Sequence, residues 1–161
     1  MTRGSTRHRG QALVEFALVA PLFFLILFAI IDFGRYVYYV QILNNAAREG
    51  ARYAIVHGAN GIPSSGPPAP GTTSSDPSGA NVKATVRDYL VGVIGSGSTT
   101  TTDIQVCWLN RPTGTTPRCG GNNGREYPVE VTVDYQFRSV IPIVPIPPVT
   151  VRGTSTLVIN N

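Results

Sequence analysis

Few residues in the chain have side chains that catalysis or metal binding needs. The two histidines are His8, in a basic N-terminal stretch, and His57. A Ser-His-Asp or Cys-His site would have to use His57, and no nucleophile-elbow motif accompanies it. Cys107 and Cys119 stand twelve positions apart with no histidine nearby, so they are poor zinc ligands. We therefore expect no enzyme activity, no metal site and no cofactor.

A single carboxylate lies within a long apolar stretch near the N-terminus. Residues 13–31 read LVEFALVAPLFFLILFAII, and Glu15 is their only charged residue. Nineteen residues at a helical rise of about 1.5 Å span about 28 Å, close to the roughly 30 Å hydrocarbon core of a bilayer. The stretch lacks the polar face of a water-exposed surface helix. The sequence therefore predicts one membrane-spanning helix.

The charges around this helix predict its orientation. Arg3, Arg7 and Arg9 precede it, and Arg35 follows it closely. The excess of positive charge predicts that the N-terminus lies in the cytoplasm and the rest of the chain outside, as in a single-pass membrane protein. Without the first ten residues the net charge of +4 would be 4 − 3 = +1. With only 14% charged residues, we expect no nucleic-acid partner. Because no catalytic motif is present, we also expect no small-molecule substrate.

Three processing outcomes are compatible with such an N-terminus. An ordinary signal peptide has an apolar region of about 7–15 residues and a small-residue cleavage site. This stretch is longer, and residues 30–33, IIDF, offer no such site. The helix could instead remain as an uncleaved anchor, or the chain could lose only its basic leader and keep the helix.

The position of Glu15 favours removal of the leader. A carboxylate in a membrane segment costs roughly 2.5–3.5 kcal/mol on insertion scales and usually has a partner or a role. Cleavage between Gly10 and Gln11 would place the new α-amino group four residues before Glu15, on the same helical face. The carboxylate would then neutralise its own N-terminus or that of a neighbouring subunit. Alternatively, Glu15 simply lies at interface depth, and the residues alone weigh the two readings equally.

Residues 10–16 read GQALVEF, with basic residues before them and an apolar run after them. This arrangement resembles the prepilin-peptidase site of type IV pilin-like proteins. Over GQALVEFALVAPLFFLILFAIIDFGR (10–35) and AAREGARYA (46–54), the chain is more specifically similar to the TadE/TadG-like minor pilins, or pseudopilins, of tight-adherence pili. The resemblance implies cleavage after Gly10 by a prepilin peptidase and a subunit-docking role for Glu15. It also implies an inner-membrane precursor that is exported into a pilus or to its base.

The helix is predicted to continue beyond the membrane, over residues 11–57. Apolar residues from Tyr36 to Ala54 recur at helical spacing, and His57-Gly58 followed by Pro63 marks an end. Several residues on this face are small: Ala46, Ala47, Gly50, Ala51 and Ala54. They would permit tight packing on the domain's own sheet, which we favour, or close approach of helices from different subunits.

The remaining sequence predicts a small domain. Residues 58–81 are almost wholly Gly, Pro, Ser, Thr and Ala, which predicts a flexible loop without a core. Asn81 is expected to cap a short helix on which Val82, Val86, Leu90 and Val93 align. Strands are expected at 104–109, at 127–138, where apolar and polar residues alternate, and at 149–159, with Gly153 as a candidate bulge.

The predicted fold class is therefore α+β, a long transmembrane and stalk helix packed on a small antiparallel sheet, as in type IV pilins. The expected divisions are a leader (1–10), the helix (11–57), the flexible loop (58–81) and an extracytoplasmic domain (82–161). Outside the cytoplasm, a disulfide between Cys107 and Cys119 is expected, with two free thiols as the alternative.

The proline-rich segment 140–148, VIPIVPIPP, should form an extended arc or edge because its prolines lack N–H donors. Its apolar residues could contact lipid headgroups or a partner subunit, or could cover the end of the domain's own core.

These observations lead to two functional hypotheses. The first is a structural or assembly subunit of a tight-adherence pilus, which would contact the membrane, a prepilin peptidase, other pilin subunits and the assembly machinery. The second is an uncleaved, membrane-anchored extracytoplasmic module for binding or adhesion, without a filament. The two differ in whether the leader is removed and whether Glu15 matters.

Overall fold

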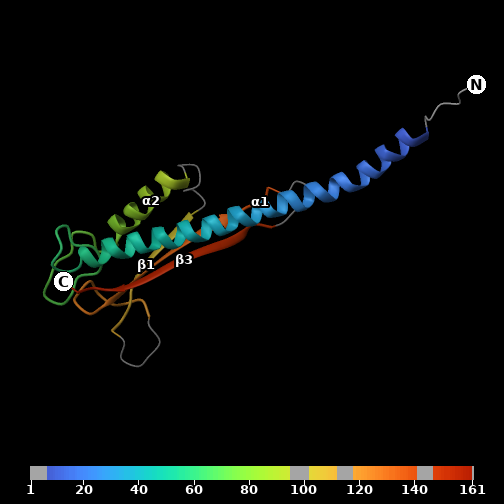
Figure 1. The fold of residues 1–161 in the computed structure, drawn as a ribbon. Helices are drawn as coiled ribbons and strands as arrows, with labels where there is room; N and C mark the ends of the chain where they lie inside the picture. Colours follow the sequence, from blue (N-terminus) through green and yellow to red (C-terminus); the bar gives the residue numbers. More distant parts are fainter. Residues whose placement is uncertain (1–6, 95–101, 112–117, 141–146, 161) are drawn as a thin grey trace, which may run out of the picture.

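A single long helix and a three-stranded sheet dominate the structure. The computed structural model describes residues 7–94, 102–111, 118–140 and 147–160. The element order is α1 (Arg7–Val56), α2 (Ala80–Ile94), β1 (Thr102–Trp108), β2 (Pro128–Phe137) and β3 (Val149–Val158). The C-terminal half of α1 lies along the sheet, and its N-terminal half projects beyond the domain (Figure 1). This arrangement confirms the predicted α+β fold.

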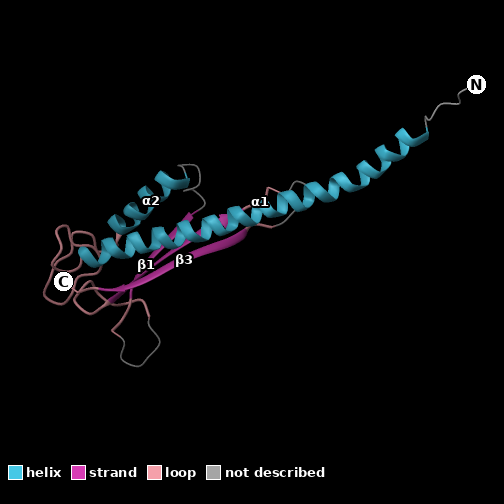
Figure 2. Cartoon of the chain, in the orientation of Figure 1, coloured by secondary structure: helices cyan, strands magenta, loops and turns pink. Residues whose placement is uncertain are grey.

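The sheet is antiparallel, with strand order β1-β2-β3. Its strands, magenta in Figure 2, lie beside α1. The alternation predicted for the central strand is present, because Val129, Val131 and Val133 are fully buried. Polar residues line the opposite face, where Thr132 of β2 meets Thr154 of β3. One face of the sheet thus packs on the helices, and the other faces solvent.

The core forms between the sheet and the small residues of α1. Ala46, Ala47, Ala51 and Ala54 are fully buried in the same cluster as the inward-facing valines. A Cβ added to Gly50 would overlap Val86 of α2 and approach Val131 to 3.2 Å. The small residues therefore let α1 pack closely on its own domain, which confirms the favoured reading of this face.

Gly153 does not form the bulge that the sequence analysis considered. The ladder between β2 and β3 is continuous, with Val133 opposite Gly153. A Cβ at Gly153 would instead overlap the backbone of Leu43 on α1. The glycine is needed for the close approach of helix and strand rather than for a break in the strand.

The predicted short helix is present, but its cap is a different residue. Val82, Val86 and Leu90 are fully buried as expected, while the side chain of Val93 lies outside the described residues. Helix α2 begins at Ala80, so Asn81 lies inside it. The buried carboxylate of Asp76 accepts hydrogen bonds from the backbone N–H groups of Ala80 at 2.9 Å and Asn81 at 2.8 Å. The prediction of Asn81 as the cap was therefore wrong.

The loop between the two helices is held by polar contacts that its composition does not reveal. Ser65 is fully buried, and its hydroxyl donates to Asp76 at 3.2 Å. Asn123, also fully buried, donates to the Ser65 carbonyl at 3.2 Å and accepts from the Ala69 N–H at 3.2 Å. The expectation of a flexible loop without a core did not include these buried polar groups, each of which has hydrogen-bond partners.

Candidate functional site

The N-terminal half of α1 carries the predicted processing and docking residues. Gly10 and Glu15 are exposed, and the Gln11 side-chain amide donates to a Glu15 carboxylate oxygen at 3.1 Å. This contact agrees with the expected adjacency of positions 11 and 15 on one helical face. An added Cβ at Gly10 would meet no atom within 4 Å.

The same half of α1 is apolar and uncovered. Within the described residues one helix could span a membrane by length and composition, with a mean hydropathy of 2.7 in its most apolar window. No part of that window is buried inside the protein. Leu13, Phe16, Leu18 and Ile30 are each more than 60% exposed. A water-soluble domain rarely leaves such a surface open, and this segment has the length, composition and exposure of a helix that spans a membrane.

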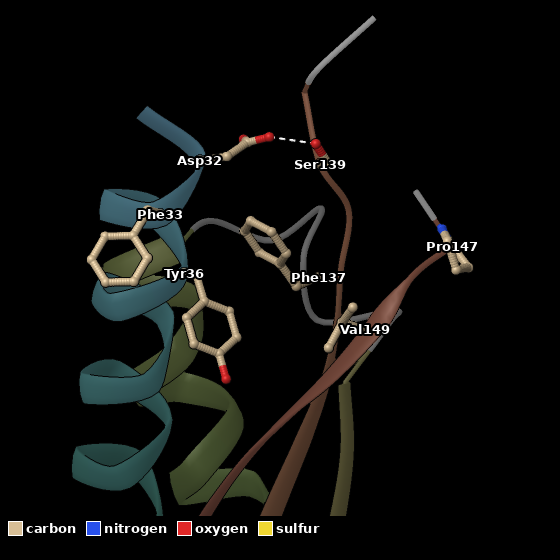
Figure 3. Close-up of a pocket in the computed structure, with 7 residues that line it drawn as sticks. All are labelled: Asp32, Phe33, Tyr36, Phe137, Ser139, Pro147 and Val149. Carbon is tan, nitrogen blue, oxygen red and sulfur yellow. Dashed lines mark hydrogen bonds between the residues drawn. The ribbon is translucent and has the colours of Figure 1, made fainter. Parts of the chain in front are cut away.

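The structure places a second carboxylate where the apolar segment ends. Asp32 is only 8% exposed, although the residues on either side of it, Ile31 and Phe33, are 47% and 69% exposed. It accepts a hydrogen bond from the Ser139 hydroxyl (Figure 3). It accepts another from the backbone N–H of Val140, at 3.0 Å. Arg35, one turn further along α1, forms an ion pair with it at 2.9 Å. Asp32 thus ties the chain that leaves β2 to the point where α1 leaves the membrane segment.

Aromatic contacts strengthen this junction between helix and sheet. The ring of Tyr36 packs edge-on against Phe137 at 5.9 Å between centroids, and the Arg35 guanidinium lies 5.3 Å from the same ring. One turn further along the helix, Tyr39 stacks on Tyr135 at 4.7 Å. Such aromatic and cation–π pairs add to the burial of the rings themselves.

A hollow of about 210 Å³ opens at the junction. Asp32 and Ser139 lie at one edge of it, and most of its walls are apolar (Figure 3). Its lining residues are Asp32, Phe33, Tyr36, Phe137, Ser139, Pro147 and Val149. Neither a histidine nor a cysteine is among them, and the carboxylate is engaged by its donors. The hollow is suited to apolar contact rather than to acid–base chemistry.

The sequence analysis did not identify Asp32 or Ser139. Asp32 could have been found, because it is the first charged residue after the apolar run and stands three positions before Arg35. No local pattern marks Ser139, which lies 107 residues further along the chain. Of the arc 140–148, residues 141–146 lie outside the described residues, so its predicted role was not tested.

The cysteines lie at the other end of the sheet. The structure contains a disulfide between Cys107 and Cys119, with Cα atoms 5.3 Å apart. Cys107 is in β1, and Cys119 forms an isolated antiparallel β-bridge with Leu109, the residue that follows that strand. The bond therefore ties the segment that precedes β2 to the end of β1.

His57 is engaged in structural contacts. Its Nδ1 lies 3.0 Å from the Tyr53 carbonyl oxygen, and its ring stacks on that of Tyr53 at 3.9 Å. These contacts secure the C-terminal end of α1. Over the described ranges, no three metal-ligating side chains come together as a group that could hold an ion.

Comparison with known proteins supports what the sequence suggested about the N-terminal segment of the chain. Residues 10–52 match the family model described as TadE-like protein. No curated protein and no solved structure matches the chain. The matched segment begins at Gly10, includes Glu15 and Asp32, and extends through most of the helix that packs on the sheet. The match confirms the resemblance that residues 10–35 and 46–54 suggested, and it shows that residues 10–52 of this chain are similar to TadE-like proteins.

Proposed function

We propose that this protein is a structural or assembly subunit of a tight-adherence, type IV-like pilus, a TadE-like minor pilin without catalytic activity. The match of residues 10–52 to the TadE-like family, a family associated with Tad pili, carries this proposal. The exposed apolar N-terminal half of α1, which projects beyond the small domain, supports it. In a pilus, helices of neighbouring subunits would cover the apolar surface that the isolated chain leaves open.

In this proposal the precursor is inserted in the inner membrane with its N-terminus in the cytoplasm and its domain outside. A prepilin peptidase cleaves between Gly10 and Gln11 and removes Arg3, Arg7 and Arg9 with the leader. Glu15 then pairs with an N-terminal amine during docking between subunits. The exposure of Glu15 and its adjacency to Gln11 support this role, because neither residue is engaged by the domain.

The N-terminal residue of the protein recovered from its native membrane or surface fraction tests the proposal. Intact-mass measurement or terminal sequencing should find a chain that begins at Gln11. A chain that retains Met1 or Thr2 would instead favour the uncleaved, anchored binding module. A chain that begins beyond Ile31 would show that the helix is only a secretion signal.

A pair of glycine variants separates recognition by the peptidase from effects on the helix. Neither Gly10 nor Gly34 has an atom within 4 Å of an added Cβ, and both lie in α1. Neither variant should cause a steric clash within the chain. Gly10→Val should abolish processing, because Gly10 precedes the bond that the peptidase is proposed to cut, whereas Gly34→Val should be processed like the wild type. Equal processing of the two variants would contradict cleavage at Gly10.

A further inference from the structure

The end of the apolar segment indicates where the membrane surface lies along α1. Residues 13–31 span about 28 Å, which matches the roughly 30 Å hydrocarbon core. Asp32 follows directly, so its carboxylate lies where the helix emerges from the hydrocarbon. Phe33, Tyr36 and Tyr38 come next and are 69%, 38% and 51% exposed. Aromatic rings at this position are typical of the membrane–water interface.

One end of the sheet lies beside Asp32, at the same height along α1 as the end of the apolar segment. The Ser139 hydroxyl and the Val140 N–H both donate to Asp32. Val149, the first residue of β3, pairs with Phe137, two residues before Ser139. The chain that leaves β2 and the chain that enters β3 therefore lie beside the helix at the membrane boundary.

This end of the sheet exposes apolar and cationic side chains together. Val140 is 56% exposed and Val149 is 46% exposed. Arg138 is exposed as well, and the Arg35 side chain is 36% exposed. Asp32 balances one of the two cations, so a net positive charge remains. We call Arg35, Arg138, Val140 and Val149 the boundary surface.

We propose that the boundary surface rests on the lipid bilayer, with Val140 and Val149 in the interface and Arg35 and Arg138 at anionic headgroups. Asp32 is the positioning residue that holds the sheet against the helix at this depth. The surface is continuous with the membrane-spanning helix, and its charge complements anionic lipids. The proposal requires only that α1 spans the membrane, so it stands or falls separately from cleavage of the leader and from pilus assembly.

Depth-dependent fluorescence quenching tests the contact in the full chain, reconstituted in nanodiscs of phosphatidylcholine and phosphatidylglycerol. Trp108 is the only tryptophan, is 5% exposed, and pairs with Val129 at the opposite end of β2 from Phe137. Val140→Trp adds a probe on the boundary surface. Thr156→Trp is the matched control, because Thr156 is exposed on β3 and pairs with Glu130, far from that surface.

Lipids brominated near the ester end of their acyl chains should quench the added emission of Val140→Trp several-fold more strongly than that of Thr156→Trp. Emission of Trp108 should be unaffected in both. Equal quenching of the two added tryptophans would overturn the proposed contact with lipid.

The role of Asp32 needs a second variant. Asp32→Ala in the Val140→Trp chain should reduce the quenching severalfold, while Trp108 emission and membrane insertion stay as in the parent. Undiminished quenching would overturn the positioning role. Should Trp108 emission show that this variant unfolds, Ser139→Ala, which removes one donor to Asp32, takes its place with the same expected direction.

The charge contribution has its own comparison. Quenching of Val140→Trp should be stronger in discs that contain phosphatidylglycerol than in discs of phosphatidylcholine alone, and Arg138→Gln should reduce this difference. Quenching that does not depend on anionic lipid would overturn the role of the two arginines.

Discussion

Gly153 of β3 lies directly against the backbone of Leu43 on α1, so closely that a Cβ would overlap the Leu43 carbonyl. Leu43 is fully buried, and Val133 lies opposite Gly153 on the neighbouring strand. This contact sets the distance between helix and sheet in the middle of the domain. Because the obstacle is backbone rather than a flexible side chain, the helix would have to move to admit even one methyl group.

Gly153→Ala should therefore destabilise the domain. Overpacking of this kind typically costs about 1–3 kcal/mol, and urea unfolding in detergent micelles, followed by Trp108 fluorescence, would measure it. Gly92→Ala is the control, since Gly92 lies in α2 with no atom within 4 Å of an added Cβ. That change should raise the free energy of unfolding by about 0.5–1 kcal/mol, as alanine favours a helix over glycine. The same sign for both variants would refute the close-packing argument.

Asp76 should make the stability depend on pH in the acid range. Burial by itself raises the pKa of its carboxyl, but hydrogen bonds outweigh burial and hold the pKa below its ordinary value; the donors are Asn81, Ala80, Ser78 and Ser65. The ionised Asp76 carboxylate makes its full contribution to the free energy of unfolding at pH values above the ordinary pKa of about 3.9. As the pH falls through this value and then the lower folded-state pKa, the unfolded state takes up its proton first and the contribution is lost.

Removal of this carboxylate should cost about 1–3 kcal/mol near neutral pH, because Asp76→Ala leaves the donors at the start of α2 without a partner. The variant should also lose part of the decrease in stability that the wild type shows as the pH falls below about 4. Asp88→Ala, at an exposed position of α2, should change the free energy of unfolding at neutral pH by no more than about 0.5 kcal/mol. Matching urea midpoints for the two variants at neutral pH would argue against the cap.

The disulfide offers a third measurement. Protein recovered from outside the cytoplasm should be two hydrogen atoms lighter than its reduced form, and Cys107 and Cys119 should resist alkylation until a reductant is added. Replacement of both cysteines by serine should lower the free energy of unfolding by up to about 3 kcal/mol, the scale for a loop of this length. Alkylation of both thiols without reductant would reject the bond.

The elements that follow a local period were predictable from the sequence. The apolar spacing of α1 and the alternation of β2 both depend on which side chains face the core, so each strand or helix carries its own signal. The small residues at 46–54 were interpreted correctly for the same reason. They lie on the predicted apolar face, where only a small side chain allows close packing.

Contacts between distant residues were not predictable in this way. Asn81 was a reasonable cap by residue type, but Asp76 reaches the helix start from a loop whose course the sequence does not reveal. Gly153 suggested a bulge, but a glycine is needed there because the backbone of Leu43, 110 residues earlier on α1, lies against it. Likewise Asp32 is meaningful only once Ser139 is beside it. In each case the sequence shows one partner, and the fold supplies the other.

Glu15 provides the last prediction, which concerns assembly. Glu15→Ala removes a carboxylate whose burial in a membrane costs roughly 2.5–3.5 kcal/mol at the bilayer centre, so membrane insertion should be unchanged or improved. Incorporation into filaments should nevertheless fall, because the partner for an N-terminal amine is lost. Glu49→Ala is the matched control, the same substitution on the same helix but within the domain. Immunoblots of sheared surface filaments and of membranes would compare the variants, and undiminished assembly with Glu15→Ala would count against the docking role.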